Sequence, residues 1–464
     1  MINFAVYYPI WKEAVILAWP VILNHIFTTA MRTTDMILMG FFGPAAVTAV
    51  GLGDLWESVI LRIGLGMGTG SISLISQESG ISSQLADANK DIILSQVIYI
   101  AFIIGIPFIF IGLIIPEQLI AVLGASSEVI KLGAQYLLII FAAAPFRIAA
   151  IISARALQGS GDTKTPMLVE VVANIINILI SAVLALGLFG IPRMGVPGVG
   201  IGTFAAKTFS AVVFIIIFLS PKSKFNLKNP IKYWNFTIIK QLFKVSMPKI
   251  VQGFYQSFIT FPFNSIILLL GTEAAAAFHI ARRIFQQLIA PMHRSYYTVT
   301  TIMSGKNIGG GKVEQSKKTV EAMIILTILS IGFFSLMIFF TSPYLVGLFG
   351  DNEASLRMAV QFLKAFSVGG PLITIYGVLA GHLNGAGNTK SALYGNLISQ
   401  TLLKLGLSYL LAVVFDIGLL GVLIAIPLDF LGRSLWVGRK YLSDDWILEA
   451  DILIKERRTE GGAE

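Results

Sequence analysis

Apolar residues dominate this chain in runs of roughly 20 residues or more, which short polar stretches separate. A run of that length crosses a hydrocarbon layer of about 30 Å as a helix. The pattern predicts an all-α integral membrane protein with twelve membrane-spanning helices. We place them at 14–40, 49–76, 92–115, 132–157, 166–189, 197–219, 246–270, 274–303, 321–341, 358–383, 391–413 and 419–438.

The second half of the chain repeats the first. Ala18-Trp-Pro20 returns as Ser246-Met-Pro248, and Gly159-Ser-Gly-Asp-Thr-Lys164 returns as Gly385-Ala-Gly-Asn-Thr-Lys390. Six spans per half is an even number, so both halves enter the membrane with the same orientation. The repeat predicts two pseudo-symmetric six-helix bundles facing a central site, an arrangement typical of secondary transporters. The predicted domains are an N-lobe (1–220), a basic cytoplasmic linker (221–237), a C-lobe (238–441) and a cytoplasmic tail (442–464).

Loop charges predict the orientation of the chain. The loops on one side hold thirteen Lys and Arg residues, and those on the other side hold three. Since cytoplasmic loops carry the excess of basic residues, both termini are expected in the cytoplasm, with the protein in the cell membrane. The net charge of +9 is assigned to these loops and to contact with anionic membrane lipids, not to nucleic acid. The chain has no cysteine, which excludes disulfides and thiolate metal ligands.

Polar residues inside the spans of the first half fall on helical stripes. A charge at the bilayer centre costs about 3 kcal/mol, so each intramembrane ionisable group is a functional candidate. From depth along their spans, we expect one residue of span 1, two of span 5 and one of span 6 to meet in the outer half of the N-lobe: Asp35, Asn177, Ser181 and Thr203. The stripes also include Asn24, Thr28, Glu170, Asn174, Lys207 and Ser210.

Several of these charges allow two interpretations. Asp35 either titrates during a transport cycle or forms a salt bridge with Arg32, three residues earlier on the same side of the helix. Asp54 and Glu57 lie either at the level of the lipid headgroups or in a cavity. Glu170 is interpreted as a cavity carboxylate for a cationic substrate, with an interfacial charge as the alternative.

The second half has the opposite character, because its spans carry mainly basic residues. These are Arg282, Arg283, His293, Arg294, Lys364 and Lys404, with Asp429 as the obvious counter-charge. Span 11 repeats the stripe of span 5 with Asn396, Gln400, Lys404 and Ser408. Two interpretations stay open: hydrogen bonding inside the bundle, or a wall of the C-lobe that attracts anions.

The segment Ala156-Leu-Gln-Gly-Ser-Gly-Asp-Thr-Lys-Thr-Pro-Met167 resembles the span 4–5 signature of the multidrug and toxic compound extrusion (MATE) family. An Asp late in span 1, before Gly43-Pro44 and Ala49-Val-Gly-Leu52, is also similar to that family. The resemblance covers the whole chain and fits the archaeal, proton-coupled, DinF-like type. It implies a secondary active multidrug efflux transporter that exports amphipathic cationic compounds in exchange for protons, by alternating access.

The same resemblance implies a cation or proton coupling site in the N-lobe. Asp35, Asn177 and Thr203 match three of the family's four positions, whereas Ser181 replaces a second Asp. The loss of that carboxylate disfavours a sodium site more than a proton site. The sodium-type branch carries acids in spans 7 and 10, and this chain has none between Ser246 and Leu270 or between Met358 and Leu383.

The remaining expectations concern substrate, hinge and partners. The expected substrate-binding residues are Asn24, Thr28, Met31, Glu170 and Asn174, and Pro20 is the expected hinge in span 1. We expect no cofactor and no bound metal apart from the coupling ion, a proton or Na⁺. The expected partners are small amphipathic substrates and membrane lipids, for a protein that acts as a monomer and does not bind nucleic acid.

Two other functions compete with drug export. The basic C-lobe favours a flippase of the same superfamily (MOP) for an anionic lipid-linked saccharide or phospholipid. A membrane-embedded enzyme would need a loop rich in acids or histidines. The loops here are short, and Asp444-Asp445 is their one acidic pair, so the chain is predicted not to be an enzyme.

Overall fold

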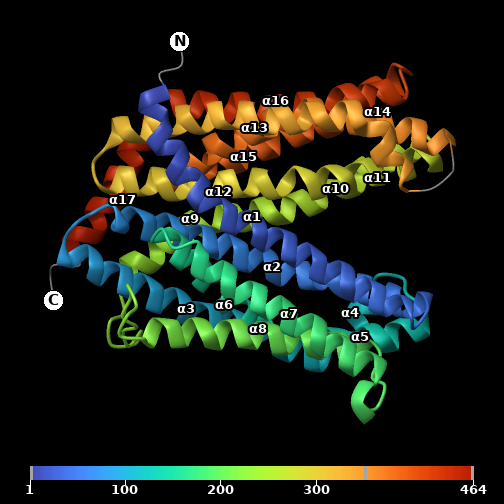
Figure 1. Ribbon diagram of the computed structural model, residues 1–464, viewed down its shortest axis with the longest axis horizontal. Coiled ribbons are helices and arrows are strands. Elements are labelled where there is room, and N and C mark those ends of the chain that lie inside the picture. Colours follow the sequence, from blue (N-terminus) through green and yellow to red (C-terminus); the bar gives the residue numbers. More distant parts are fainter. Residues whose placement is uncertain (1–3, 350–352, 461–464) are drawn as a thin grey trace. The chain divides into compact units, whose positions relative to one another are not determined.

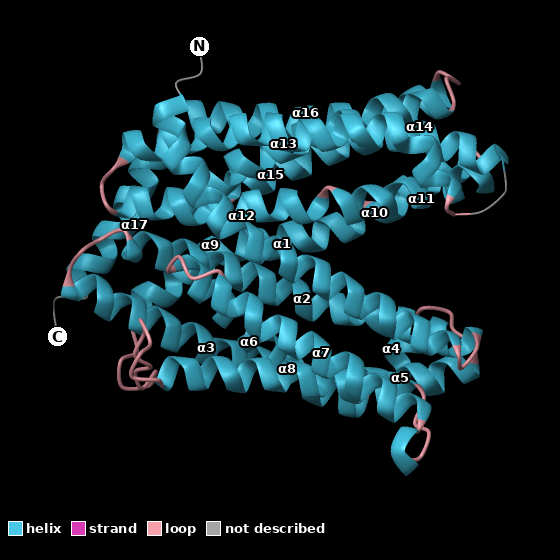
Figure 2. Cartoon of the chain, viewed as in Figure 1, coloured by secondary structure: helices cyan, strands magenta, loops and turns pink. Residues whose placement is uncertain are grey.

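The computed structural model describes residues 4–349 and 353–460; the parts of the predicted domains and loops at 1–3, 350–352 and 461–464 lie outside these ranges. The described residues form helices joined by short loops and contain no strand (Figure 2). The helices are α1 (Phe4–Gly40), α2 (Pro44–Ser79), α3 (Gln84–Ile114), α4 (Pro116–Ala121), α5 (Ser127–Ala142), α6 (Ala144–Gly159), α7 (Lys164–Leu186), η1 (Leu188–Gly190), α8 (Val196–Leu219), α9 (Phe236–Phe258), α10 (Thr260–Leu269), α11 (Thr272–Leu288), α12 (Ala290–Gly309), α13 (Val313–Gly347), α14 (Glu353–Gly385), α15 (Lys390–Ser399), η2 (Gln400–Leu407), η3 (Leu410–Val414), α16 (Leu419–Leu442) and α17 (Asp445–Glu460).

The helices cover all twelve predicted spans, and the chain is a multi-pass membrane protein. Among the described residues, nine helical segments are long and apolar enough to cross a membrane, and α5 with α6 makes a tenth, bent by 49°. The predicted spans 246–270 and 274–303 are each divided, between α9 and α10 and between α11 and α12. The second break precedes Pro291, which has no N–H to continue the helix.

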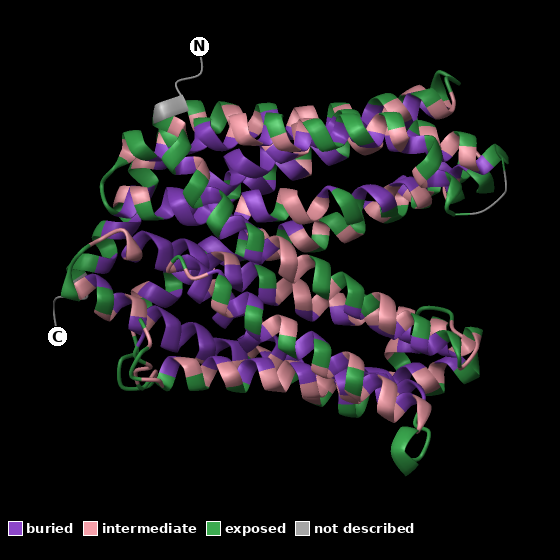
Figure 3. Ribbon diagram, viewed as in Figure 1, coloured by how far each residue is buried: buried purple, intermediate pink, exposed green. Residues whose placement is uncertain are grey.

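Helix α12, in the predicted span 274–303, is not among the helices apolar enough to cross a membrane by composition. Its residues are buried along most of its length (Figure 3), among them Ser295, Thr298, Thr300 and Ser304. Thr298 and Thr300 donate their hydroxyls to carbonyls four residues earlier. Polar residues are tolerated here because neighbouring helices, not lipid, surround the helix.

The repeated glycine motif forms the same turn twice. Helix α6 ends at Gly159 and α7 begins at Lys164; α14 ends at Gly385 and α15 begins at Lys390. The middle glycine has a left-handed φ in both turns, +92° at Gly161 and +87° at Gly387, a conformation that glycine adopts without steric cost. The motif is therefore a helix stop and start signal.

Residue contacts group the chain into two compact units. The C-unit contains α1 up to Ile22, residues 76–82 at the end of α2, and the chain from Met247 onward. The N-unit contains Leu23–Ile75 and Ser83–Ser246. This division differs from the predicted lobe boundaries, because the start of α1 groups with the second half and residues 238–246 group with the first. The predicted tail contains α17, which packs in the C-unit.

In the N-unit, α7 lies along α8, and α3 packs on α6. Glycines bring α2 close to α6: a Cβ at Gly64 would lie 2.9 Å from Ile151 Cδ1, and one at Gly68 would lie 2.8 Å from Arg155 Cγ. The glycine run in span 2 thus serves close helix packing. In the C-unit, α14 is the central helix and contacts α11, α12, α13 and α16; α13, α14 and α16 run alongside one another in Figure 1.

Candidate functional site

A small pocket lies inside the N-unit, between α1, α2, α5, α6 and α8. Its volume is about 40 Å³, enough for an ion or a few water molecules and far below the several hundred Å³ of a typical drug-sized site. The pocket is lined by Thr28, Met31, Arg32, Asp35, Met36, Val50, Asp54, Glu57, Tyr136, Arg147, Thr203 and Lys207. Its size fits a coupling ion rather than a multidrug substrate.

Asp35 is the carboxylate in this pocket without a fixed partner. It is only 8% exposed, and no described residue hydrogen-bonds to its Oδ1 atom. The Ser181 side chain is close enough to interact with the carboxylate, although the contact falls short of a hydrogen bond. Arg32 is exposed and forms no ion pair with Asp35 in the described structure, so the salt bridge considered from the sequence does not form.

Asn177 and Thr203 complete the cluster around Asp35. The Asn177 Nδ2 atom donates to Thr203 Oγ1 at 3.1 Å, and both residues are buried. Helix α8 approaches α7 closely here because a Cβ at Gly202 would lie 2.9 Å from the Ser181 backbone nitrogen. Within the described chain, Asn177 Oδ1 and Ser181 Oγ have no hydrogen-bond partner. The structure thus connects all four expected coupling residues: Ser181 lies against Asp35, Thr203 lines the same pocket, and Asn177 donates to Thr203.

The other acids of this region are held by partners. Glu57 forms an ion pair with Arg147, and Asp54 accepts a hydrogen bond of 3.2 Å from the Tyr136 hydroxyl. Glu170 forms an ion pair with Lys207 at 3.0 Å. In the described residues no three His, Asp or Glu side chains gather as a metal-ligand set. Of these four acids, Asp35 is the one with neither an ion pair nor a side-chain hydrogen bond in the described part of the chain.

The expected substrate-binding residues divide into two groups. Thr28 and Met31 line the pocket, whereas Asn24, Glu170 and Asn174 do not. Glu170, interpreted above as a cavity carboxylate for a cationic substrate, forms an ion pair with Lys207. The amide of Asn174 is buried and has no hydrogen-bond partner among the described residues.

Two polar residues of the pocket escaped the sequence analysis, Tyr136 and Arg147. Arg147 is a charge inside the predicted span 132–157, so the insertion cost that selected Asp35 would also have selected it. Tyr136 gives no such signal, because a tyrosine in an apolar span is ordinary. Its role depends on the packing of α5 against α2, where a Cβ at Gly53 would clash with the Tyr136 ring.

The C-unit contains a second polar cluster, a chain of hydrogen bonds through α9, α14, α15 and α16. Lys249 donates to Gln252 at 3.1 Å, and Gln252 donates to Tyr376 at 3.3 Å. Asn396 donates to the same tyrosine hydroxyl and accepts from Arg433 at 3.2 Å. Arg433 forms an ion pair with Asp429, the predicted counter-charge. We call these six residues the C-unit chain; it carries one excess positive charge.

The stripe predicted for span 11 is interrupted. Asn396 and Gln400 are buried and hydrogen-bonded to each other at 3.1 Å. The segment Gln400–Leu407 then adopts π-helical turns, which rotate the following residues relative to an α-helix. Lys404 instead lies over the Phe263 ring, 4.6 Å from its centroid.

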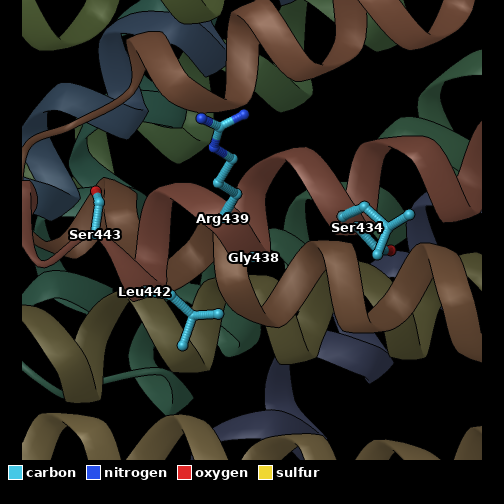
Figure 4. Close-up of a pocket in the computed structure, with 6 residues that line it drawn as sticks. Ser434, Gly438, Arg439, Leu442 and Ser443 are labelled. Atoms are coloured by element: carbon cyan, nitrogen blue, oxygen red, sulfur yellow. The ribbon is translucent and has the colours of Figure 1, made fainter.

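A second pocket lies on the surface of α16 in the C-unit. Figure 4 shows Arg439 and Ser434 on this helix, with Gly438, Leu442 and Ser443 beside them; Leu435 completes the lining. It shares no residue with the C-unit chain and contains one charged group. It is therefore not our candidate for the coupling site.

Comparison with known proteins identifies the family. The MatE family model matches residues 20–183 and 248–410, more than half of the chain and both copies of the repeat. The chain is 24% identical over 454 residues to the probable multidrug resistance protein NorM of Thermotoga maritima, covering 97% of this chain and 96% of that protein. It is 22% identical to the probable multidrug resistance protein YoeA of Bacillus subtilis, covering 76% of each.

Solved structures show the same fold. The crystal structure of MATE in the straight conformation superposes with a TM-score of 0.83 at 20% identity and covers 97% of both chains. An outward-facing multidrug resistance MATE transporter of the MOP superfamily superposes with a TM-score of 0.82 at 21% identity, covering 93% of this chain and 96% of that one. With the family model matching both halves, this protein belongs to the MATE family of membrane transporters.

Proposed function

We propose that this protein exports amphipathic small molecules, chiefly cations, from the cell in exchange for protons. The relatives described as probable multidrug resistance proteins support export of drugs. One observation carries the choice of the proton: Asp35 is a buried carboxylate without a hydrogen bond to Oδ1 in the described chain, beside the Ser181 hydroxyl, which also lacks a partner there. Protonation would remove a costly buried charge and turn that carboxylate into a hydrogen-bond donor.

The proposed cycle depends on this single change of charge. The protonated Asp35 can donate its O–H to Ser181 Oγ, so protonation favours a tighter packing of α1 against α7. Pro20 weakens α1 because it leaves the carbonyl of Ile16 without its helical hydrogen bond. The division between the two compact units falls at Ile22 and Leu23, directly after this proline. We therefore assign the hinge to Pro20 and the switch to Asp35.

The charges of the chain also support the choice of coupling ion and the orientation in the membrane. A proton needs one carboxylate only, whereas a bound Na⁺ would rely on Asp35 and neutral oxygens, since Ser181 supplies no second charge. The excess of Lys and Arg in one set of loops supports a position in the cell membrane with both termini in the cytoplasm. We propose that the protein acts as a monomer.

The decisive experiment is transport in proteoliposomes with one gradient imposed at a time. A fluorescent amphipathic cation should be driven by a pH gradient and not by a Na⁺ gradient. Transport driven only by Na⁺ would refute proton coupling, and no transport under either gradient would refute the exporter.

A flippase for an anionic lipid-linked substrate is the second candidate. The excess positive charge of the C-unit chain favours it, because a basic wall attracts phosphate groups. A flippase should move a fluorescent anionic lipid analogue between leaflets without a pH gradient. Absence of that movement, together with proton-driven export of the cation, would leave drug export as the function.

A further inference from the structure

Lys249 is a membrane-embedded cation without a counter-charge. It lies thirteen residues into α9 and is half-buried. Its ammonium donates to the Gln252 side chain and lies 5.2 Å from the centre of the Tyr297 ring. No carboxylate of the described chain forms an ion pair with it, whereas Arg433 in the same chain of hydrogen bonds has Asp429. An unpaired charge in the interior of a membrane protein is costly, which indicates that an anion joins it.

The hydrogen bonds of the C-unit chain leave a second donor unused. A lysine ammonium only donates, so Gln252 must turn its oxygen toward Lys249 and its NH₂ toward Tyr376. An arginine also only donates, so Asn396 must turn its oxygen toward Arg433 and its NH₂ toward Tyr376. The Tyr376 hydroxyl therefore accepts two hydrogen bonds. Its own proton has no acceptor among the described residues.

These two donors lie next to each other, because Lys249 and Tyr376 bind opposite atoms of the same Gln252 amide group. Two adjacent donors, one charged and one neutral, match the two oxygens of a carboxylate. The Tyr297 ring beside Lys249 adds an aromatic face. A lipid phosphate would present the same oxygens, but this face favours a flat organic acid.

We propose that Lys249 and Tyr376 form a binding site for the carboxylate group of an amphipathic aromatic substrate. The site extends the proposed function, on which it rests, from cations to zwitterions and organic anions. Gln252 and Asn396 act as positioning residues, since each donates to the Tyr376 hydroxyl and thereby orients it. Both N–H donors of Asn396 are in use, one to Tyr376 and one to the Ala392 carbonyl.

The test compares two dyes that differ in one group: a xanthylium dye with a free benzoate carboxylate, and its methyl ester. Binding of each to the purified protein is measured by fluorescence anisotropy. The variants are Lys249→Gln, which removes the charge, Lys249→Arg, which keeps it, and Tyr376→Phe, which removes the O–H donor. Lys244→Gln on the same helix is the matched control, because Lys244 is exposed.

Lys249→Gln should weaken binding of the carboxylate dye roughly tenfold and leave that of the ester within about twofold, since a charge-assisted hydrogen bond is lost for one dye only. Tyr376→Phe should act in the same direction by a smaller factor, and Lys249→Arg should retain the preference for the carboxylate. Lys244→Gln should bind both dyes as the parent does.

Equal weakening of both dyes by Lys249→Gln would show a merely structural role and overturn the site. Unchanged binding of the carboxylate dye by that variant would overturn it too, as would failure of the parent to bind that dye. Export of the ester under a pH gradient is measured in parallel, so that failure of the exporter proposal is recognised separately. Retained binding of the ester shows that each variant is folded.

Discussion

Arg457 and Glu78 form an ion pair that is withdrawn from solvent, with 2.7 Å between Arg457 Nε and Glu78 Oε1 and side-chain exposures of 0% and 1%. Arg457 also donates to Gln77 Oε1 at 2.7 Å, and Gln77 donates to the Gly385 carbonyl at 2.8 Å. The pair fixes α17, in the predicted tail, to the end of α2 inside the C-unit. Trp446 of the same helix is fully buried and packs its ring edge to face with His382.

Arg457→Leu should destabilise the protein markedly, because it leaves the buried Glu78 carboxylate without its guanidinium. Breaking a buried pair by removing one partner costs roughly 3–5 kcal/mol. The measurement is the midpoint of thermal unfolding in detergent. The double variant with Glu78→Leu should recover much of the loss, and Lys455→Leu, which removes an exposed ion pair, should change the midpoint little. A midpoint of Arg457→Leu equal to that of the parent would contradict the prediction.

Asp35→Asn should abolish export driven by a pH gradient while leaving insertion intact. Asn has the shape of Asp but cannot titrate, so the charge change that drives the proposed cycle is lost. Export of a fluorescent cation from proteoliposomes provides the measurement. The matched control is Glu117→Gln, an exposed acid in α4. Export by Asp35→Asn at the parent's rate would show that another group carries the proton.

Ser181→Asp should introduce Na⁺ dependence. Ser181 interacts with Asp35, so a second carboxylate there creates a site with two charges and the oxygens of Asn177 and Thr203. Hard cations bind carboxylate and amide oxygens. Transport is measured across a wide series of Na⁺ concentrations. The control is Ser210→Asp, because Ser210 is also a buried serine but lies on α8. A response equal to that of the parent would mean that the two carboxylates do not share an ion.

Glu170→Gln should weaken cationic substrates more than neutral ones. In the structure Glu170 forms an ion pair of 3.0 Å with Lys207. Removing the negative charge of Glu170 leaves the positive charge of Lys207 uncompensated, and that charge repels a cationic substrate. The double variant with Lys207→Gln should restore binding of cations toward that of the parent, because no net charge is then left. Lys404→Gln should have little effect, since Lys404 lies in the C-unit over Phe263. The measurement is the affinity of each variant for a fluorescent cation and for a neutral analogue. Loss of cation binding in Lys404→Gln alone would refute a drug site in the N-unit.

Pro20→Ala should slow transport by stiffening α1. Alanine restores the hydrogen bond to the Ile16 carbonyl and favours a straight helix by about 3 kcal/mol relative to proline. Proton binding at Asp35 should be retained, because Asp35 lies fifteen residues further along the helix. The control is Pro9→Ala, at an exposed position near the start of α1. Equal transport rates for the Pro20 and Pro9 variants would place the hinge elsewhere.

The sequence by itself determined the helices and the repeat, and it supplied the candidates for the coupling site. Long apolar runs can cross a membrane only with their backbone hydrogen bonds satisfied internally, which requires helices. The intramembrane cost of charge singled out Asp35, and the spacing of Asn177, Ser181 and Thr203 placed them on faces at the same depth. These signals are local, since each depends on composition and helical period along one segment.

Only the tertiary structure decided which charges remain unpaired. Glu170 and Lys207 are 37 residues apart in sequence, and Arg457 and Glu78 are 379 apart, so helical periodicity within one span cannot pair them. Likewise Arg433 of α16 sets the orientation of Asn396 on α15, and Gln252 of α9 and Asn396 meet at Tyr376 on α14. The unused proton of Tyr376 therefore depends on the packing of four helices. A single helix fixes where a polar group lies along the membrane normal, but packing against other helices fixes whether its charge and hydrogen bonds are satisfied.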